Sequence, residues 1–137
     1  MPQEIDLKGR LCLVTGGAGM LGRVLVSQLL DKGTRVRILD IEPVKNDRAE
    51  VVAGDVRDEA AVRKACEGVD TVFHAAAAVW DSRLPLDIYE STNVTGTKIV
   101  VGACLQLGVP RLVYSSSMDV VMDGAHGHCL ADESAPY

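Results

Sequence analysis

The chain has 137 residues, of which 47% are hydrophobic and 24% charged, a composition typical of one globular domain over residues 1–137. Its net charge of −5 and the lack of a basic cluster argue against nucleic acid or an acidic membrane surface as a partner. No apolar run reaches the roughly 18 residues of a membrane span. The N-terminus carries acids where a secretory signal would have an apolar segment, so we expect a cytoplasmic protein.

The four cysteines lie far apart and form no C-x-x-C pair, which favours reduced thiols, three of them serving as small packing residues. Reduced thiols agree with a cytoplasmic location. His126, His128 and Cys129 crowd one loop without a fourth ligand at zinc-like spacing. We therefore expect no metal site.

The first predicted strand, residues 11–14, runs directly into a glycine-rich turn. Residues 15–22 read T-G-G-A-G-M-L-G, which matches both G-x-G-x-x-G and T-G-x-x-G-x-x-G. Such glycines allow a tight turn, a close approach of backbone to a pyrophosphate, and close packing of the following helix, predicted over 21–32. The amides at the N-terminus of that helix face the phosphate charge. The expected dinucleotide contacts here are Thr15, Gly16, Gly17, Gly19, Met20, Leu21 and Gly22.

A second predicted strand, residues 35–40, ends in an acid. The Asp40 carboxylate can accept hydrogen bonds from both hydroxyls of an adenosine ribose, and it repels a 2′-phosphate, which favours NAD over NADP. Ile41 is expected to contribute to the same contact. Arg37 and Lys45 are the nearby cations that would favour NADP instead. The alternative interpretation of Asp40 is a solvated acid at a strand end.

A short third strand, residues 51–53, precedes Gly54-Asp55-Val56. We expect the Asp55 side chain to meet the adenine amino group and Val56 to meet the adenine ring. A turn-forming aspartate is the alternative for Asp55. The next predicted helix covers 59–67 and is capped by Asp58.

The fourth predicted strand, residues 71–74, ends in a histidine and is followed by small residues. His74 is interpreted as a packed histidine at a strand end rather than a catalyst. Ala75, Ala76 and Ala77 offer small side chains where the ribose and nicotinamide of a cofactor must pass close to backbone. Packing between helix and sheet also selects alanine, so that alternative stays open.

A long helix is predicted over about residues 89–107, ending near Gly108. Asn93 on this helix is a candidate cofactor contact, and the simpler interpretation is an asparagine that ties down a neighbouring loop. A fifth strand, residues 111–115, leads into Ser115, Ser116 and Ser117, and from Met118 onward the composition predicts a loop. Serines at this point could bind a substrate oxygen or only form the turn that leaves the strand.

Strands that alternate with helices, without hairpin signals, predict an α/β fold with a doubly wound parallel sheet of the Rossmann type, truncated after the fifth strand. Ligands of such sheets bind outside the carboxyl ends of the strands. The candidate residues Thr15, Asp40, Asp55, His74 and Ser115 all fall at such ends.

Together these motifs resemble the extended short-chain dehydrogenase/reductase family. The matching segments are T-G-G-A-G-M-L-G at 15–22, L-D at 39–40, G-D-V at 54–56, V-F-H-A-A at 72–76, N-V-T-G-T at 93–97 and L-V-Y-S-S-S at 112–117. Residues 114–121 and 131–137 most resemble the branch of 3β-hydroxysteroid and sterol dehydrogenases. The branch of nucleotide-sugar epimerases and dehydratases shares the earlier motifs. Met20 stands where the family usually has an aromatic residue.

The resemblance implies a catalytic Ser, Tyr and Lys, with Tyr and Lys in a Y-x-x-x-K motif. It assigns the serine to Ser117, with Ser116 as a substitute. Tyr137 is the last residue, and in this branch an acidic stretch ending in Pro-Tyr precedes the catalytic tyrosine, so Tyr137 is not interpreted as that residue. We therefore expect the chain to lack the Tyr-Lys pair and the substrate lobe, and to be inactive alone.

Three functions stay open at this stage. The first is an NAD-dependent oxidoreductase that acts on the secondary alcohol of a steroid-like or other hydrophobic small molecule. The second is a nucleotide-sugar epimerase or dehydratase that uses NAD, and the third is a non-catalytic dinucleotide-binding module. The long helix resembles one that pairs between subunits in this family, which implies a homodimer of the intact protein.

Overall fold

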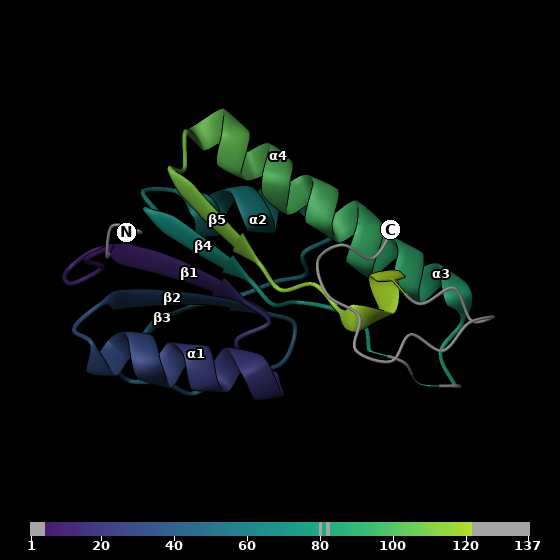
Figure 1. Cartoon of the computed structure of the whole chain (residues 1–137), viewed down its shortest axis with the longest axis horizontal. Helices are drawn as coiled ribbons and strands as arrows, with labels where there is room; N and C mark the ends of the chain where they lie inside the picture. Colours follow the sequence, from purple (N-terminus) through teal and green to yellow (C-terminus); the bar gives the residue numbers. More distant parts are fainter. Residues whose placement is uncertain (1–4, 80, 82, 122–137) are drawn as a thin grey trace.

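The computed structural model describes residues 5–79, 81 and 83–121 of the chain. A single parallel sheet with helices on both faces forms the described part (Figure 1). The strands are β1 (Leu11–Thr15), β2 (Arg35–Asp40), β3 (Glu50–Ala53), β4 (Thr71–His74) and β5 (Arg111–Tyr114). The α-helices are α1 (Met20–Asp31), α2 (Glu59–Cys66), α3 (Leu86–Tyr89) and α4 (Thr97–Leu107).

The strand order is β3-β2-β1-β4-β5, and every neighbouring pair is parallel. The chain first builds outward from β1 to β3 and then crosses to the other side of β1 for β4 and β5. The carboxyl ends of β1 and β4 thereby become neighbours at the point where the order reverses, with Thr15 paired to His74. This arrangement confirms the predicted doubly wound parallel sheet.

The two faces of β1 build two separate cores. Leu11 and Leu13 pack into one cluster with residues of α2 and α4, whereas Cys12 and Val14 pack into a second cluster with residues of α1. Figure 1 shows α1 on one side of the sheet and α2 and α4 on the other. The whole of β1 is buried because both of its faces are covered, which explains its unbroken apolar sequence.

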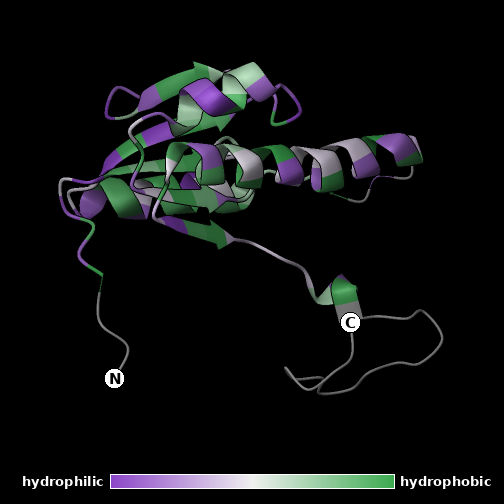
Figure 2. Cartoon of the chain, turned by 90° about the horizontal axis from the view of Figure 1, so that it is seen from above, coloured by the Kyte–Doolittle hydropathy of each residue, from purple (hydrophilic) through white to green (hydrophobic). Residues whose placement is uncertain are grey.

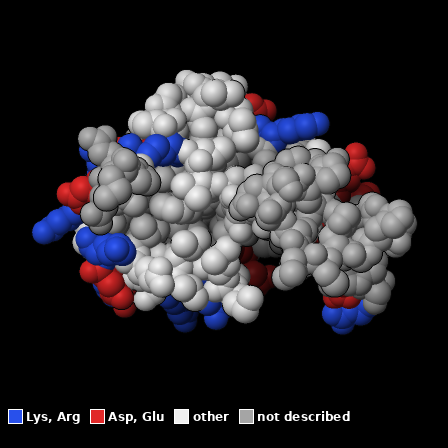
Figure 3. Space-filling model, viewed as in Figure 1, with Lys and Arg blue, Asp and Glu red and all other residues white. Residues whose placement is uncertain are grey.

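Strand β5 forms an edge of the sheet. Figure 2 shows it as a largely hydrophobic strand on the outer side of the sheet. Leu112, Val113 and Tyr114 are 36%, 51% and 51% exposed. In Figure 3, which has the view of Figure 1, the charged side chains lie mostly round the margin of the molecule, and uncharged atoms occupy the middle of the part that is not drawn in grey. The carboxyl end of β5 is therefore far more open than that of β1.

The predicted long helix starts earlier than the sequence indicates and is not uniform. Helical backbone runs from Leu86 to Leu107, and its middle, Glu90–Gly96, is a π-helix between α3 and α4. Gly108 ends the helix in the left-handed conformation, as predicted. Strand β5 stops one residue before Ser115, and Met118–Val121 form a 3-10 turn where a loop was expected.

The described cysteines agree with the expectation of reduced thiols that serve in packing. Cys12, Cys66 and Cys104 are free and buried, which confirms their role in packing, and Cys129 lies outside the described residues. Burial raises the pKa of the Cys66 thiol to about 12, so this thiol is protonated and unreactive at neutral pH.

Within the described ranges, no helix is long and apolar enough to cross a membrane.

A pair of glycine substitutions tests how tightly the first turn is packed. A Cβ at Gly22 would lie 2.0 Å from the Gly16 carbonyl oxygen, whereas a Cβ at Gly102 in α4 meets nothing within 4 Å. We expect Gly22→Ala to lower the free energy of unfolding by about 3 kcal/mol. Gly102→Ala is the control and should raise it by up to about 1 kcal/mol, because alanine favours helix. Urea denaturation measures both, and equal effects would contradict the packing argument.

Candidate functional site

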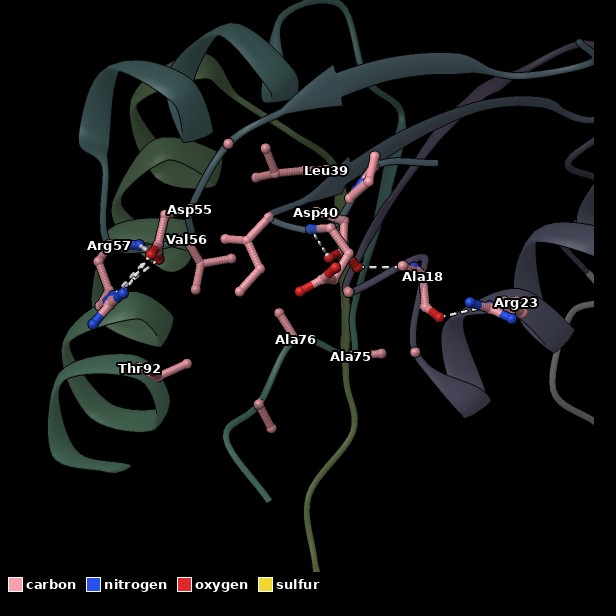
Figure 4. A pocket seen from close by; sticks show the side chains of 17 residues that line it. Ala18, Arg23, Leu39, Asp40, Asp55, Val56, Arg57, Ala75, Ala76 and Thr92 are labelled. Atoms are coloured by element: carbon pink, nitrogen blue, oxygen red, sulfur yellow. Dashed lines mark hydrogen bonds and ion pairs between the residues drawn. The ribbon is translucent and has the colours of Figure 1, made fainter. Parts of the chain in front are cut away.

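A pocket of about 390 Å³ lies at the carboxyl ends of the strands, within the range of small-molecule sites (Figure 4). Its walls come from the turn after β1 and from the segments that follow β2, β3 and β4. The pocket brings together nine of the predicted cofactor contacts, which are Gly16, Gly19, Asp40, Ile41, Asp55, Val56, Ala75, Ala76 and Ala77.

The floor of the pocket is a contact between two backbones. Gly16 has a φ of +71°, and a Cβ there would lie 2.7 Å from the Ala76 Cα atom. The Gly16 amide donates to the Leu39 carbonyl oxygen at 2.9 Å, which anchors the turn to β2. Only glycine at position 16 combines this φ with this close approach.

The N-terminus of α1 is open toward the pocket. No side chain caps it, and its first turn carries no acid. Helix α2 is different, because the Asp58 carboxylate accepts hydrogen bonds from the amides of Ala60 and Ala61. The first amides of an uncapped helix, together with the helix dipole, form a binding site for an anion such as phosphate. This end of the pocket therefore fits the pyrophosphate of a dinucleotide.

Asp40 lies between the two ends of the pocket (Figure 4). One carboxylate oxygen accepts from the Ala18 amide at 2.8 Å and the other from the Glu42 amide at 2.9 Å. These bonds hold the carboxylate in place and leave lone pairs on both oxygens for ribose hydroxyls. The acid is therefore built into the site rather than merely solvated.

The two cations that could reverse the NAD preference lie elsewhere. Arg37 is paired with Glu50 and donates to the carbonyl oxygens of Ala65 and Glu67 at the end of α2. Lys45 lines a neighbouring cavity of about 440 Å³ instead. Neither residue lines the pocket that holds Asp40.

Asp55 and Arg57 form the end of the pocket opposite Arg23 (Figure 4). The Arg57 side chain binds both carboxylate oxygens of Asp55, and this pairing holds the pKa of the carboxyl below its usual range. Arg23 donates to the Ala18 carbonyl oxygen beside the open end of α1. Our sequence reasoning missed both arginines. The sequence marks them only by their positions, because Arg23 directly follows the glycine turn and Arg57 directly follows Asp55-Val56.

Thr15 and His74 lie under the pocket, not in its wall. Both are buried, and the Thr15 hydroxyl lies 2.7 Å from His74 Nδ1. The Ala76 amide donates to the same hydroxyl, and His74 Nε2 lies within hydrogen-bond distance, 3.0 Å, of the Thr97 hydroxyl. Burial lowers the pKa of His74 and keeps it neutral. The structure thus confirms a packed histidine, stacked on Tyr114.

The segment after β4 is held by the long helix. Asn93 accepts from the Ala78 amide at 2.8 Å and donates to the Ala78 carbonyl oxygen at 3.0 Å. The Tyr89 hydroxyl makes the same pair of bonds to the backbone of Asp81. Asn93 therefore ties down a loop, as the simpler interpretation predicts, and stands behind the pocket wall instead of in it.

Several predicted contacts do not line the pocket. Met20 is 89% exposed and Leu21 is also exposed, whereas Gly17 packs against Ile38 and Gly22 against the glycine turn. Ser115, Ser116 and Ser117 are exposed beyond β5, where the Ser117 hydroxyl donates to Asp119. Tyr137 and the loop with His126, His128 and Cys129 lie outside the described residues. Among the described residues, no group of His, Cys, Asp or Glu is placed to hold a metal ion.

His74 should make stability depend on pH. Its pKa is lower in the folded chain than the value of about 6.5 of an unfolded histidine, so the unfolded state takes up the proton first. Stability is complete above about pH 6.5 and falls as the pH drops below that value, by up to about 1.4 kcal/mol per pH unit. Urea denaturation between about pH 7 and 5 measures this slope.

The control for this experiment replaces the other histidines. His74→Gln should flatten the slope, whereas His126→Gln with His128→Gln should retain it. A slope that survives His74→Gln would show that another group carries the proton linkage.

Comparison with known proteins matches residues 13–137 to the model of the 3-beta hydroxysteroid dehydrogenase/isomerase family. The chain is 38% identical to a 3beta-hydroxysteroid-dehydrogenase/decarboxylase isoform 1 of Arabidopsis thaliana, over 100% of this chain and 35% of that protein. It is 40% identical to a 3 beta-hydroxysteroid dehydrogenase/Delta 5-->4-isomerase of Mycobacterium tuberculosis, over 91% of this chain and 36% of the relative. The chain thus spans about a third of the length of these relatives.

Solved structures share the same fold. A short-chain dehydrogenase/reductase superfamily protein from Agrobacterium tumefaciens with bound NAD is 33% identical, with a TM-score of 0.83 over 93% of this chain and 38% of that chain. A UDP-glucose 4-epimerase of Thermus thermophilus in complex with NAD is 28% identical, with a TM-score of 0.69 over 78% of this chain and 37% of that chain. On its family match over residues 13–137, the chain belongs to the 3-beta hydroxysteroid dehydrogenase/isomerase family, within the extended short-chain dehydrogenases/reductases.

Proposed function

We propose that this chain is the NAD-binding part of a dehydrogenase that oxidises or reduces a hydrophobic alcohol or ketone. The observation that carries the proposal is one pocket that joins an uncapped helix N-terminus to a fixed carboxylate. The first suits a pyrophosphate and the second suits a ribose with free hydroxyls. Similar solved proteins with bound NAD support the choice of cofactor.

In this proposal each part of the cofactor lies on a different segment of the pocket wall. The pyrophosphate lies on the turn at Gly16 and Gly19, and the adenosine ribose on Asp40. The adenine lies against Val56 and Asp55 at the far end. The nicotinamide ribose then passes along Ala75–Ala77, toward the open carboxyl end of β5. A cofactor bound in this way would supply a hydride acceptor or donor, and Ser115 and Ser117 would lie on the substrate side of it.

A steroid-like substrate is supported by the family and by relatives named as 3β-hydroxysteroid dehydrogenases. In this proposal the Ser117 hydroxyl binds the reacting oxygen, and a base outside the described residues takes the alcohol proton. A nucleotide-sugar epimerase that uses NAD is the second candidate, favoured by the UDP-glucose 4-epimerase among the structural neighbours.

Self-association of the intact protein is part of the proposal. Val94 and Leu105 are exposed apolar residues on the long helix, and a homodimer would cover such a surface. A cytoplasmic location stays a prediction from the sequence.

The cofactor assignment depends on Asp40. We expect the chain to bind NAD⁺ saturably and NADP⁺ more weakly, because the carboxylate repels a 2′-phosphate. In Asp40→Asn, the affinity for NAD⁺ should fall about tenfold, the size of one charge-assisted hydrogen bond, and the preference for NAD⁺ should shrink. Isothermal titration calorimetry with both dinucleotides measures these constants.

Asp47→Asn is the matched control, since Asp47 is an exposed acid of the β2–β3 connection and does not line the pocket. It should leave both affinities unchanged. A folded chain that binds neither dinucleotide would contradict the proposed function. Equal effects of the two substitutions would show that net charge, rather than the Asp40 carboxylate, sets the preference.

A further inference from the structure

We propose that Arg57 is a positioning residue for adenine recognition. It holds the Asp55 carboxylate toward the pocket so that Asp55 accepts a hydrogen bond from the amino group of the base. The site then prefers a purine with an amino group at its six-position over one with an oxygen there. This inference rests on the proposed function, because it concerns the adenine end of the same dinucleotide site.

The first argument is the number of bonds between these two residues. Asp55 Oδ1 accepts from the Arg57 amide at 2.9 Å and from Arg57 Nε at 3.0 Å. Asp55 Oδ2 accepts from Nε at 3.0 Å and from Nη2 at 2.6 Å. Bonds from both the backbone and the planar guanidinium leave the carboxylate little freedom to rotate. Arg57 Nη1 also donates to Ser91 on the long helix at 3.4 Å, which links the pair to a second element.

The second argument is the place of the pair. Asp55, Val56 and Arg57 all line the pocket. A Cβ at the preceding Gly54 would lie 2.8 Å from Ala61 Cβ, so this segment packs closely on α2 and is fixed in position. In Figure 4 the pair lies at the end of the pocket away from Arg23, beyond Asp40 and next to Val56. A base placed beyond the ribose subsite at Asp40 therefore reaches Asp55.

The third argument is the chemistry of the carboxylate. Arg57 holds the pKa of Asp55 below its usual range, so the group is ionised and can only accept hydrogen bonds. An ionised carboxylate has about four lone-pair positions. Arg57 supplies three N–H donors to it, of which Nε is shared between the two oxygens, so the carboxylate retains room for one further donor. A donor such as an amino group satisfies it, whereas a carbonyl oxygen in the same place meets a like partial charge. The carboxylate therefore selects a base with an amino group, both because it attracts the amino group and because it repels a carbonyl oxygen.

The chain contains a matched control for this arrangement. Asp81 and Arg83 have the same spacing and the same bonds, with the Arg83 amide at 3.0 Å from Asp81 Oδ1 and Arg83 Nη2 at 2.6 Å from Asp81 Oδ2. Neither residue lines the cofactor pocket, and Arg83 is largely exposed. Removing Arg83 therefore breaks an equivalent pair without touching the proposed adenine subsite.

The experiment compares NAD⁺ with its hypoxanthine analogue, in which an oxygen replaces the adenine amino group. Calorimetry gives the ratio of the two dissociation constants for the chain and for Arg57→Ala, Arg57→Lys and Arg83→Ala. We expect the parent chain to prefer NAD⁺ about tenfold, the worth of one hydrogen bond to a charged group. Arg57→Ala should lower this ratio several-fold, Arg57→Lys should restore part of it, and Arg83→Ala should leave it unchanged.

Asp55→Asn links the effect to the carboxylate, because an amide can donate to the oxygen of the analogue and should bring the ratio close to one. A ratio that Arg57→Ala and Arg57→Lys leave at the parent value would overturn the inference, even if both variants bind more weakly overall. Equal losses of ratio in Arg57→Ala and Arg83→Ala would also overturn it. Failure of the parent chain to bind either dinucleotide would instead contradict the proposed function itself.

Discussion

The close contact between Gly16 and Ala76 is the constraint on which the rest of the site depends. These two residues follow the neighbouring strands β1 and β4 at the point where the strand order reverses, and their backbones approach so closely that no side chain fits between them. The contact is locked from below by the Thr15 hydroxyl, which accepts from the Ala76 amide and bonds to His74. A buried threonine and a buried neutral histidine thus hold the floor of the pocket in place.

Other segments round the pocket are also held by hydrogen bonds from a side chain to the backbone of a neighbouring segment. Asn93 and Tyr89 reach from the long helix and bond the backbone of the segment after β4. Asp40 bonds the Ala18 amide in the glycine turn and so joins the segments after β1 and β2. Protein groups make these bonds on both sides, so the segments round the pocket are fixed to the sheet and to the long helix. Such preorganisation favours affinity, because fewer loops lose conformational freedom on association.

The sequence predicted the features that local chemistry determines. Residues 11–14 of β1 are apolar because both faces of the strand are covered, and Asp58 caps α2 because a carboxylate before a helix binds its first amides. Gly16 and Asp40 were predicted as parts of the pocket because a phosphate-binding turn and a ribose-binding acid occur at fixed places in the βαβ pattern.

The features that the sequence did not predict arise from tertiary contacts. The π-helix at Glu90–Gly96 has no local signature, and a Cβ at Gly96 would lie 2.8 Å from a Val56 side-chain atom. The contact between the helix and the pocket wall joins segments that are far apart in the sequence, so local sequence patterns do not predict it. Arg57 looks like any surface arginine until the structure shows its pairing with Asp55 at the pocket. Asn93 and Ser117 show the converse, because both lie outside the pocket wall despite their motif.

The pocket also explains why relatives with different named activities share this part of the chain. The glycine turn, Asp40 and Asp55 all come from the first three strands and the segments after them, and in the proposed function they contact only the cofactor. The serines after β5 lie at an exposed strand end and do not line this pocket. Substrate chemistry can therefore change there without disturbing the Gly16–Ala76 contact. A steroid dehydrogenase and a sugar epimerase can accordingly retain the same cofactor half and differ in what is placed beside β5.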